Sequence, residues 1–153
     1  DADPWQLSNT YSNLGAAYAK KSEHEKAIDY FEKSLAISLK TLGSEHPNVA
    51  TSYSNLGEAC RNMGKHDKAL EYCKNSLAIQ LKTLGPEHPV VGITYNNIGL
   101  AYDNKGEYDK ALEYYEKALP IYLKTLGEEH PEVATTYNNI GLAYAKKGEW
   151  SEA

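Results

Sequence analysis

The chain has 153 residues, a net charge of −5 and 41% hydrophobic residues, among them 13 Tyr but only 1 Phe. It has no basic stripe, which argues against nucleic-acid binding, and no apolar stretch that could span a bilayer or serve as a signal peptide. Two cysteines, Cys60 and Cys73, cannot form a disulfide framework, which favours a reducing compartment. Together these features predict a cytoplasmic protein with no nucleic-acid or membrane partner.

A period of 42 residues organises the whole chain. Residues 94–102 (TYNNIGLAY) recur unchanged at 136–144, and four tyrosines fall in step: Tyr11, Tyr53, Tyr95 and Tyr137. A fixed period of this size predicts a solenoid, in which each repeat leaves an apolar face that only the next repeat can cover. We expect one array over residues 1–153, with repeats at approximately 1–43, 44–85, 86–127 and 128–153, the last incomplete.

Each repeat is expected to begin with a helix. In repeat one, Asp3 and Pro4 are typical of an N-cap and a first turn. In repeat three, Pro89 suits a first turn and Gly106 a helix end. The apolar face between them has the helical spacing of three and four residues: Tyr95, Ile98, Gly99 and Tyr102.

A second helix is expected to follow in each of the first three repeats. In repeat three, residues 107–109 form the expected turn, Asp109 is the expected N-cap, and Gly127 closes the helix. Gly99 and Ala111 let the two antiparallel helices approach closely. We therefore expect about seven helices, four first and three second, and no strand. The chain ends where the second helix of repeat four should begin, which suggests a fragment of a longer array or an array completed by a neighbouring molecule.

Pro120 lies inside this second helix, where repeats one and two have Ala36 and Ala78. Proline removes the N–H that would bond the carbonyl of Glu116, at a cost of about 3 kcal/mol in an ideal helix. We expect an outward-facing Pro120 and a kink above about 20°. The alternative is two short helices joined at Leu119 and Pro120.

The repeated residues resemble the tetratricopeptide repeat signature. Tyr11-x2-Leu14-Gly15-x2-Tyr18 followed by Ala27-x3-Phe31 looks like aromatic-x2-Leu-Gly-x2-Tyr followed by Ala-x3-Phe. The usual repeat has 34 residues; the longer form found here, with its His-Pro connector, is similar to the repeats of kinesin light chain. The resemblance implies an all-α, right-handed superhelical solenoid of antiparallel helix pairs, with the first helices lining the concave side.

A second stripe on each first helix is left free by the packing, and the resemblance places it in the groove. We call it the free stripe; in repeat three it comprises Ile93, Asn96, Asn97, Leu100 and Asn104. One amide recurs in every repeat: Asn13, Asn55, Asn97 and Asn139. A carboxamide both donates and accepts, which suits the main chain of an extended peptide, and the resemblance implies such a role. Alternatively, these amides cap turns, bond each other or face water.

The predicted peptide-binding residues are drawn mainly from repeats three and four: Asn13, Asn55, Asn96, Asn97, Leu100, Asn104, Asn138, Asn139, Leu142 and Lys146. Binding should centre on Asn97, Leu100, Asn139 and Leu142, because apolar side chains rimmed by amides suit a peptide anchor. In repeats one and two, Ala16 and Glu58 stand at the matching places. Alternatively, Leu100 and Leu142 only pack between neighbouring first helices.

Other conspicuous residues predict no chemistry. Three of the five histidines belong to the recurring His-Pro pair, which indicates a loop-fixing hydrogen bond rather than a metal site. Cys60 and Cys73 stand at aromatic core positions and are expected to be buried thiols. There is no acid–base pair, activated nucleophile or phosphate loop, so we expect no enzyme, no cofactor and no metal.

Three functions remain open. The first is an interaction scaffold whose groove holds a peptide segment of a partner protein. The second is a structural array that self-associates head to tail through the exposed last helix, where Tyr137, Ile140 and Tyr144 lack a partner. The third is a targeting or regulatory segment of a larger protein.

Overall fold

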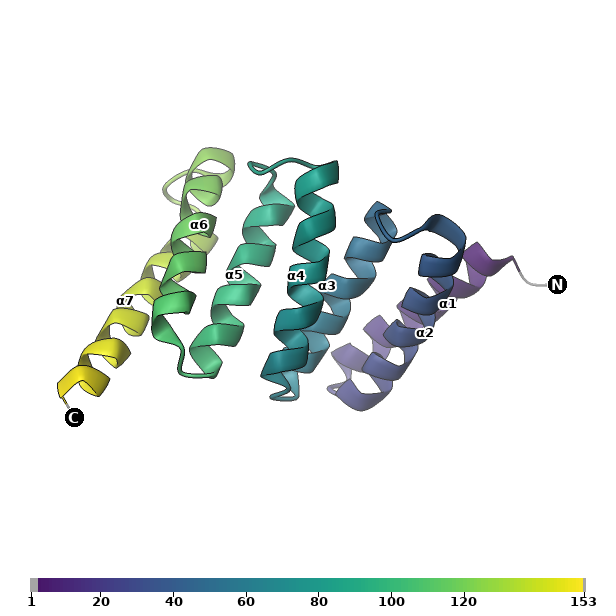
Figure 1. The fold of residues 1–153 in the computed structure, drawn as a ribbon, viewed down its shortest axis with the longest axis horizontal. Helices are drawn as coiled ribbons and strands as arrows, with labels where there is room; N and C mark the ends of the chain where they lie inside the picture. The colour runs from purple at the N-terminus through teal and green to yellow at the C-terminus, as the bar shows by residue number, and fades with distance from the viewer. Residues whose placement is uncertain (1–2, 153) are drawn as a thin grey trace. The chain divides into compact units, whose positions relative to one another are not determined.

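The structure is a computed structural model that describes the backbone of residues 3–152 and the side chains of residues 3–148. The described residues contain seven α-helices and no strand, which confirms the predicted all-α class. In order, the helices are α1 (Pro4–Lys20), α2 (His24–Leu42), α3 (Pro47–Asn62), α4 (His66–Thr83), α5 (Pro89–Asn104), α6 (Tyr108–Leu126) and α7 (Pro131–Glu152) (Figure 1).

The chain divides into two compact halves, an N-terminal half of residues 1–83 and a C-terminal half of residues 84–153. The division lies beside the expected boundary between repeats two and three. In the N-terminal half α1 pairs with α2 and α3 with α4, and α2 packs on α3. In the C-terminal half α6 packs against both α5 and α7.

Side chains cap the starts of the first helices. Asp3 accepts a hydrogen bond from the Trp5 N–H at 3.0 Å, as expected for an N-cap. The histidine of each His-Pro pair, which directly precedes α3, α5 or α7, accepts from the backbone N–H two residues on, through Nδ1 at 3.1 Å. This recurring bond confirms the loop-fixing role predicted for His46, His88 and His130.

Residues with positive φ form the turns within the repeats. Gly64 and Gly106 have φ of 75° and 78°, and Ser22, with φ of 61°, occupies the corresponding position in repeat one. Gly106 follows the end of α5, as predicted. The prediction for Asp109 was wrong: α6 begins at Tyr108, its N-cap is Glu107, and Glu107 makes no side-chain cap bond. Asp109 lies instead in the first turn of α6, where a carboxylate favours the helix dipole.

Close contact between paired helices requires glycine at one position of α1, α3 and α5. A Cβ on Gly99 would lie 2.6 Å from the ring of Tyr115, and one on Gly57 would lie 2.5 Å from Cys73 Sγ. A Cβ on Gly141 of α7 would meet nothing within 4 Å. The close approach predicted at Gly99 is confirmed, and α7 lacks a helix on this side within the described chain.

The two cysteines are free and buried, as predicted. Burial raises the pKa of the Cys73 thiol from 9.0 to about 11, and it raises the pKa of Cys60 as well. They belong to the packed layer between α3 and α4, together with Leu56 and Ala69.

The helix α6 continues through Pro120 without interruption, so the alternative of two short helices is wrong. The Pro120 side chain is exposed, as are Ala36 and Ala78 at the matching positions. Water can therefore reach the carbonyl that the proline leaves unpaired. The size of the kink stays a prediction.

The last helix is longer than expected. The sequence predicted that this helix ends before the second helix of repeat four, which should begin where the chain ends. Gly148 stands at the place of Gly64 and Gly106. Instead, α7 runs through Gly148 to Glu152. A glycine weakens a helix by only about 1 kcal/mol, so it does not stop one unless another contact draws the chain away.

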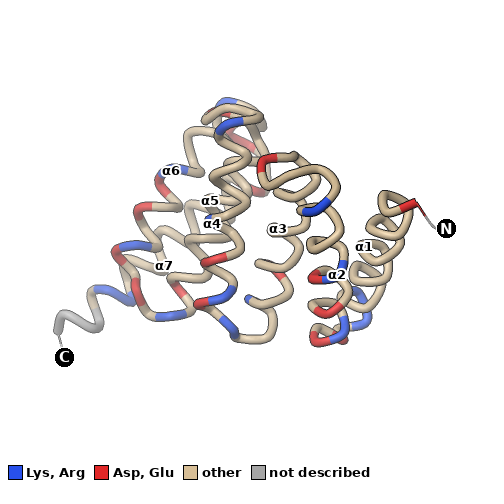
Figure 2. Tube along the Cα trace, turned by 45° about the vertical axis from the view of Figure 1, so that its right-hand side comes forward, with Lys and Arg blue, Asp and Glu red and all other residues tan. Residues whose placement is uncertain are grey.

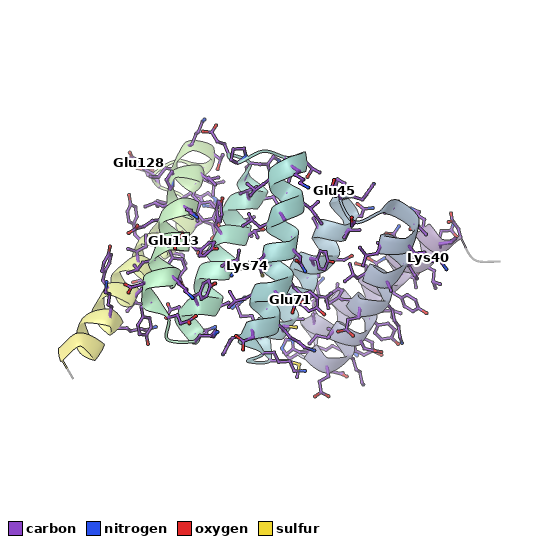
Figure 3. All side chains as sticks on the ribbon, in the orientation of Figure 1. Lys40, Glu45, Glu71, Lys74, Glu113 and Glu128 are labelled. Carbon is purple, nitrogen blue, oxygen red and sulfur yellow. The ribbon has the colours of Figure 1, made fainter. Side chains whose placement is uncertain are left out.

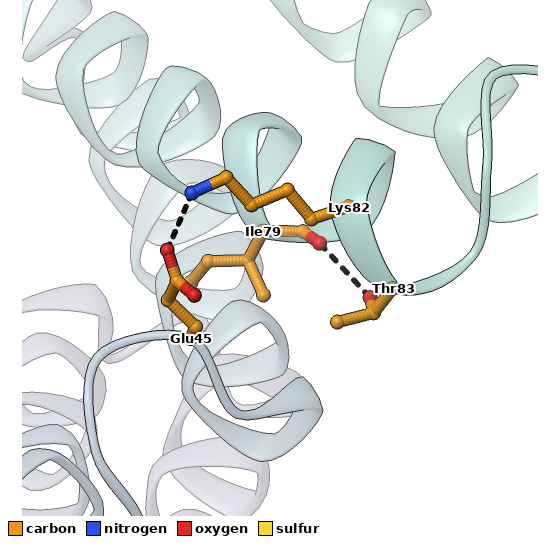
Figure 4. Close-up of polar contacts among 4 residues, drawn as sticks. All are labelled: Glu45, Ile79, Lys82 and Thr83. Atoms are coloured by element: carbon orange, nitrogen blue, oxygen red, sulfur yellow. Dashed lines mark hydrogen bonds and ion pairs between the residues drawn. The ribbon is translucent and has the colours of Figure 1, made fainter.

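Ion pairs tie the connectors before α3 and α5 to the second helix of the same repeat. Lys82 near the end of α4 pairs with Glu45 in the connector before α3, and Thr83 donates to the Ile79 carbonyl at 2.9 Å (Figure 4). Lys124 on α6 pairs with Glu87 at 2.7 Å in the same way. Both pairs are well exposed and contribute little to stability, but they repeat the same connector geometry.

Candidate functional site

Asparagine amides lie on the free stripe of every first helix. Asn13 is exposed, and Asn55, Asn97 and Asn139 are partly buried. Their carboxamides make no hydrogen bond within the described part of the chain, so they neither cap turns nor bond one another. Asn13 and Asn55 belong to the N-terminal half, Asn97 and Asn139 to the C-terminal half. Each half therefore presents two amides with both donor and acceptor capacity to solvent.

Apolar side chains accompany the amides in the C-terminal half. Ile93 on α5 is 51% exposed and Leu142 on α7 is 48% exposed, whereas Leu100 is partly buried. Asn104 and Asn138 are also exposed. The Leu142 side chain is therefore not fully buried between helices, and this favours a contact with a ligand over the packing alternative.

Asn96 differs from its counterparts in the other repeats. Its Oδ1 atom is buried and has no hydrogen-bond partner in the described chain. At the matching place in repeat two, Ser54 bonds Ser76 at 2.7 Å, but repeat three has Ala118 where repeat two has Ser76. Loss of that hydroxyl leaves the Asn96 oxygen buried without the partner that the matching position has in repeat two.

Lys146 is engaged within the fold. Its Nζ pairs with Asp103 Oδ1 at 2.9 Å and lies 5.8 Å from the centre of the Tyr108 ring. The hydrogen bond to the Asp103 carboxylate raises the pKa of Lys146. The same carboxylate also accepts a hydrogen bond from the Tyr115 hydroxyl at 3.3 Å. The predicted ligand residue Lys146 therefore links α7 to α5, and a ligand would have to compete with Asp103 for it.

Two cavities that the sequence did not predict open between α1 and α3. The larger has a volume of about 250 Å³; Ala16, Ala19, Phe31 and Ala59 form its apolar lining. The polar residues that line it are Lys20, Asn55, Glu58 and Asn62.

The smaller cavity measures about 160 Å³ and has a polar lining that includes Asn9, Ser12, Asn48 and Thr51. Three hydroxyls beneath it are already paired: Ser8 bonds Ser34 at 3.0 Å and Ser38 at 2.9 Å. Free-stripe positions line both cavities: Ala16, Lys20, Asn55, Glu58 and Asn62 the larger, and Asn9, Ser12 and Thr51 the smaller. The signal that could have found the larger cavity is the small Ala16 where repeats three and four have leucine.

The second helices of the repeats, α2, α4 and α6, carry both acidic and basic side chains. Acidic and basic residues are interspersed along the trace in Figure 2. Glu71 and Lys74 on α4 are exposed, and so is Glu113 on α6 (Figure 3). Pairs such as Glu113–Lys117 and Asp29–Lys33 recur at helical spacing. A face of this kind keeps a helix solvated and offers no field of one sign.

No group of three or more metal-ligating side chains occurs among the described residues. No helix in that same part of the chain is long and apolar enough to cross a bilayer.

The repeated helix pairs match a known family. The sequence model described as tetratricopeptide repeat matches residues 6–72, 52–124 and 104–153, which together span nearly the whole chain. The chain belongs to the tetratricopeptide repeat family. Tetratricopeptide repeats are generally protein-interaction modules and are typically not enzymes.

Solved structures support the assignment. A crystal structure of a putative kinesin light chain with nearly identical TPR-like repeats, from Podosopora anserina, is 31% identical, with a TM-score of 0.84 over 99% of this chain and 72% of that one. BtubC (BKLC) from P. vanneervenii is 28% identical, with a TM-score of 0.88 over 100% of this chain. This tetratricopeptide array spans 61% of the length of BtubC.

A more distant structure shares the fold alone. The Sgt2 TPR domain from Aspergillus fumigatus is 22% identical, with a TM-score of 0.70 over 95% of this chain and 82% of that one. No curated protein sequence matches the chain.

Proposed function

We propose that the chain is a protein–protein interaction scaffold that holds an extended peptide segment of a partner on the free stripes of its first helices. One observation carries the proposal: the recurring amides of Asn13, Asn55, Asn97 and Asn139 reach the surface with no partner in the described chain. An extended peptide presents main-chain N–H and C=O groups at regular intervals, and a carboxamide can pair with both.

The proposed contacts in the C-terminal half centre on Asn97, Leu100, Asn139 and Leu142. The half-exposed Leu142 and Ile93 support an apolar anchor there, and rotation of the Asn96 side chain would bring its buried, unpaired oxygen to the peptide as a further acceptor. Asn104, Asn138 and Lys146 complete the set, with Lys146 reached only by displacing Asp103.

A peptide array tests this function. We expect bound peptides to lose affinity by about tenfold for the Asn97→Ala/Asn139→Ala double variant, because two main-chain contacts disappear. Asn75→Ala is the matched control, since Asn75 is an exposed asparagine on α4, a second helix. A folded Leu100→Ser variant with unchanged affinity would remove Leu100 from the site, and equal binding by all variants would remove the proposal.

Two further functions have support of their own. The exposed Tyr137, Leu142 and Tyr144 on α7 favour head-to-tail self-association of a structural array. The length of BtubC relative to this chain favours a targeting or regulatory segment of a larger protein. Neither role is enzymatic. A cytoplasmic location is part of the proposal and is supported by the two free, buried cysteines.

A further inference from the structure

The two cavities between α1 and α3 are related by a constant offset along both helices. Each of these residues of the smaller cavity has a counterpart seven residues later in the larger one, in the pairs Asn9/Ala16, Ser12/Ala19, Asn48/Asn55, Thr51/Glu58 and Ser52/Ala59. Seven residues of helix rise about 10 Å. Three residues of a peptide in the extended polyproline II conformation span about 9 Å and complete one turn, so side chains at positions i and i+3 point to the same side. The spacing therefore suits two side chains of one polyproline II segment, at positions i and i+3.

The larger cavity exists because its α1 wall is small. Ala16 occupies the place held by Leu100 in repeat three and Leu142 in repeat four. The ring of Phe31 and the methyl groups of Ala19 and Ala59 form the rest of the apolar lining. Phe31 and Ala59 are buried side chains within this lining. An aliphatic side chain that enters the cavity would therefore remove its own apolar surface from water by packing against them.

The rim of the larger cavity carries one charge of each sign. Lys20 on α1 and Glu58 on α3 both line it, both are exposed, and neither has an ion-pair partner within 4.0 Å among the described residues. Around the smaller cavity, the amides of Asn9 and Asn48 make no side-chain hydrogen bond to another described residue. These free groups are complementary to a segment that combines an aliphatic anchor with polar and charged neighbours.

We propose that the α1–α3 face is a two-pocket site for an extended peptide. The larger cavity takes an aliphatic side chain of leucine or methionine size, flanked by an acidic residue facing Lys20 and a basic residue facing Glu58. The smaller cavity takes a serine, threonine or asparagine three residues away. The inference rests on the proposed peptide-binding function and adds to it an anchor site in the N-terminal half, besides the one proposed at Leu100 and Leu142.

A single substitution, taken from the other repeats, tests the larger cavity. Ala16→Leu introduces the residue that repeats three and four carry naturally, and it fills the larger cavity from an exposed helical position where leucine is well tolerated. Ala17→Leu is the matched control, because Ala17 is an exposed alanine on the same helix that does not line the cavity. Circular dichroism and thermal unfolding verify that both variants remain folded.

Random dodecapeptides displayed on phage and selected on the unmodified chain provide the probes. We expect the selected peptides to share an aliphatic residue with a hydroxyl or amide residue three positions away. Ala16→Leu should weaken their Kd by about tenfold or more, and Ala17→Leu should leave it within about twofold. Replacing the peptide's aliphatic residue by alanine should weaken binding to the unmodified chain but add little to the loss caused by Ala16→Leu.

A second variant examines the smaller cavity. Asn9→Ala/Asn48→Ala should reduce the affinity of the selected peptides by about fivefold, and the loss should disappear when the peptide's polar residue is itself replaced by alanine.

Other outcomes overturn the inference in distinguishable ways. Selected peptides that are weakened by Asn97→Ala/Asn139→Ala but not by Ala16→Leu would locate the anchor in the C-terminal half and leave the proposed function intact. A selection that enriches no peptide would overturn both. If the chain alone self-associates in sedimentation and Ala16→Leu makes it monomeric, the occupant of the cavity is a second copy and not a partner peptide.

Discussion

At the level of single residues, the glycine at each helix crossing faces a different environment in α5 and α7. Gly99 lies against the Tyr115 ring, whereas Gly141 faces open space. We expect Gly99→Ala to destabilise the chain by about 1–3 kcal/mol, because the added methyl overlaps a buried ring. Gly141→Ala should be neutral or stabilise by up to about 1 kcal/mol through helix propensity. Urea denaturation measures both, and equal losses would contradict the packing described for Gly99.

The His-Pro connectors lead to a second prediction. His88→Ala should lower the free energy of unfolding by about 1 kcal/mol, since the Val90 N–H at the start of α5 loses its acceptor. His88→Asp should retain most of the stability, because aspartate is a good N-cap. Thermal unfolding of both variants tests the idea. A similar loss for both would show that another property of the imidazole matters more than the cap.

The Cys73 thiol should be unreactive in the folded chain. Its pKa of about 11 leaves about a thousandth of it as thiolate at pH 8. In a Cys60→Ala background, where Cys73 is the remaining cysteine, we expect labelling by a disulfide reagent to be slow in buffer and fast in urea. The same shift has a consequence for stability: the contribution of the protonated thiol is full below pH 9 and is lost as the pH rises toward 11. Rapid labelling without denaturant would contradict the burial of Cys73.

Among the helices, α6 contains an unfavourable proline that its surroundings tolerate. We expect Pro120→Ala to raise the stability by about 1 kcal/mol or more, because the hydrogen bond to the Glu116 carbonyl is restored and the side chain faces solvent. The matched control is Ala78→Pro in α4, which should cost about 3 kcal/mol. A crystal structure would measure the expected kink in α6 before Pro120. Equal curvature in α2, α4 and α6 would contradict the prediction, and Pro120→Ala would then be nearly neutral.

Helix starts and ends were predictable only where the signal is local. Pro4, Pro89 and the His-Pro pairs fix helix starts through their own backbone chemistry, and all were located correctly from the sequence. Asp109 was misassigned because a capping side chain one residue away from the true start looks equally good in a sequence. The end of α7 is different, because the helix continues through Gly148 although Gly64 and Gly106 follow the ends of α3 and α5. A turn at this place depends on a second helix that folds back, and a glycine alone does not supply that contact.

For the whole molecule, α7 is the part of the surface most suited to self-association. Tyr137 and Tyr144 are 54% and 52% exposed beside the half-exposed Leu142. We expect the average mass in sedimentation equilibrium to rise with concentration and Tyr137→Lys to suppress the rise by placing a charge within the apolar patch. Glu128→Lys in the connector is a suitable control, because it makes a larger change of charge at an exposed residue outside this helix. A strictly monomeric chain at high concentration would exclude association through α7.

The family and the number of helices followed from the period, but the division into halves and the α1–α3 cavities did not. A period reports what the repeats share, whereas a cavity arises from what one repeat lacks. Ala16 was noted in the sequence only as a weaker counterpart of Leu100, because volume between two helices cannot be judged without their separation. The asparagine ladder was visible because amide identity recurs, yet the sequence could not show that Asn96 loses its partner through Ala118.

The recurring nonapeptide at 94–102 and 136–144 has a consequence for how variants should be transferred between repeats. Tyr102 is 6% exposed, while its twin Tyr144 is 52% exposed, although their local sequences are identical. When the same substitution is made once in each copy, helix propensity and most of the unfolded-state contribution are equal in the two variants. The difference between their free energies of unfolding therefore reports what the neighbouring helices add. A change that α7 accepts is therefore no guide to what α5 will accept. In a mutational scan, a consensus averaged over the four repeats would hide the contrast that carries the information.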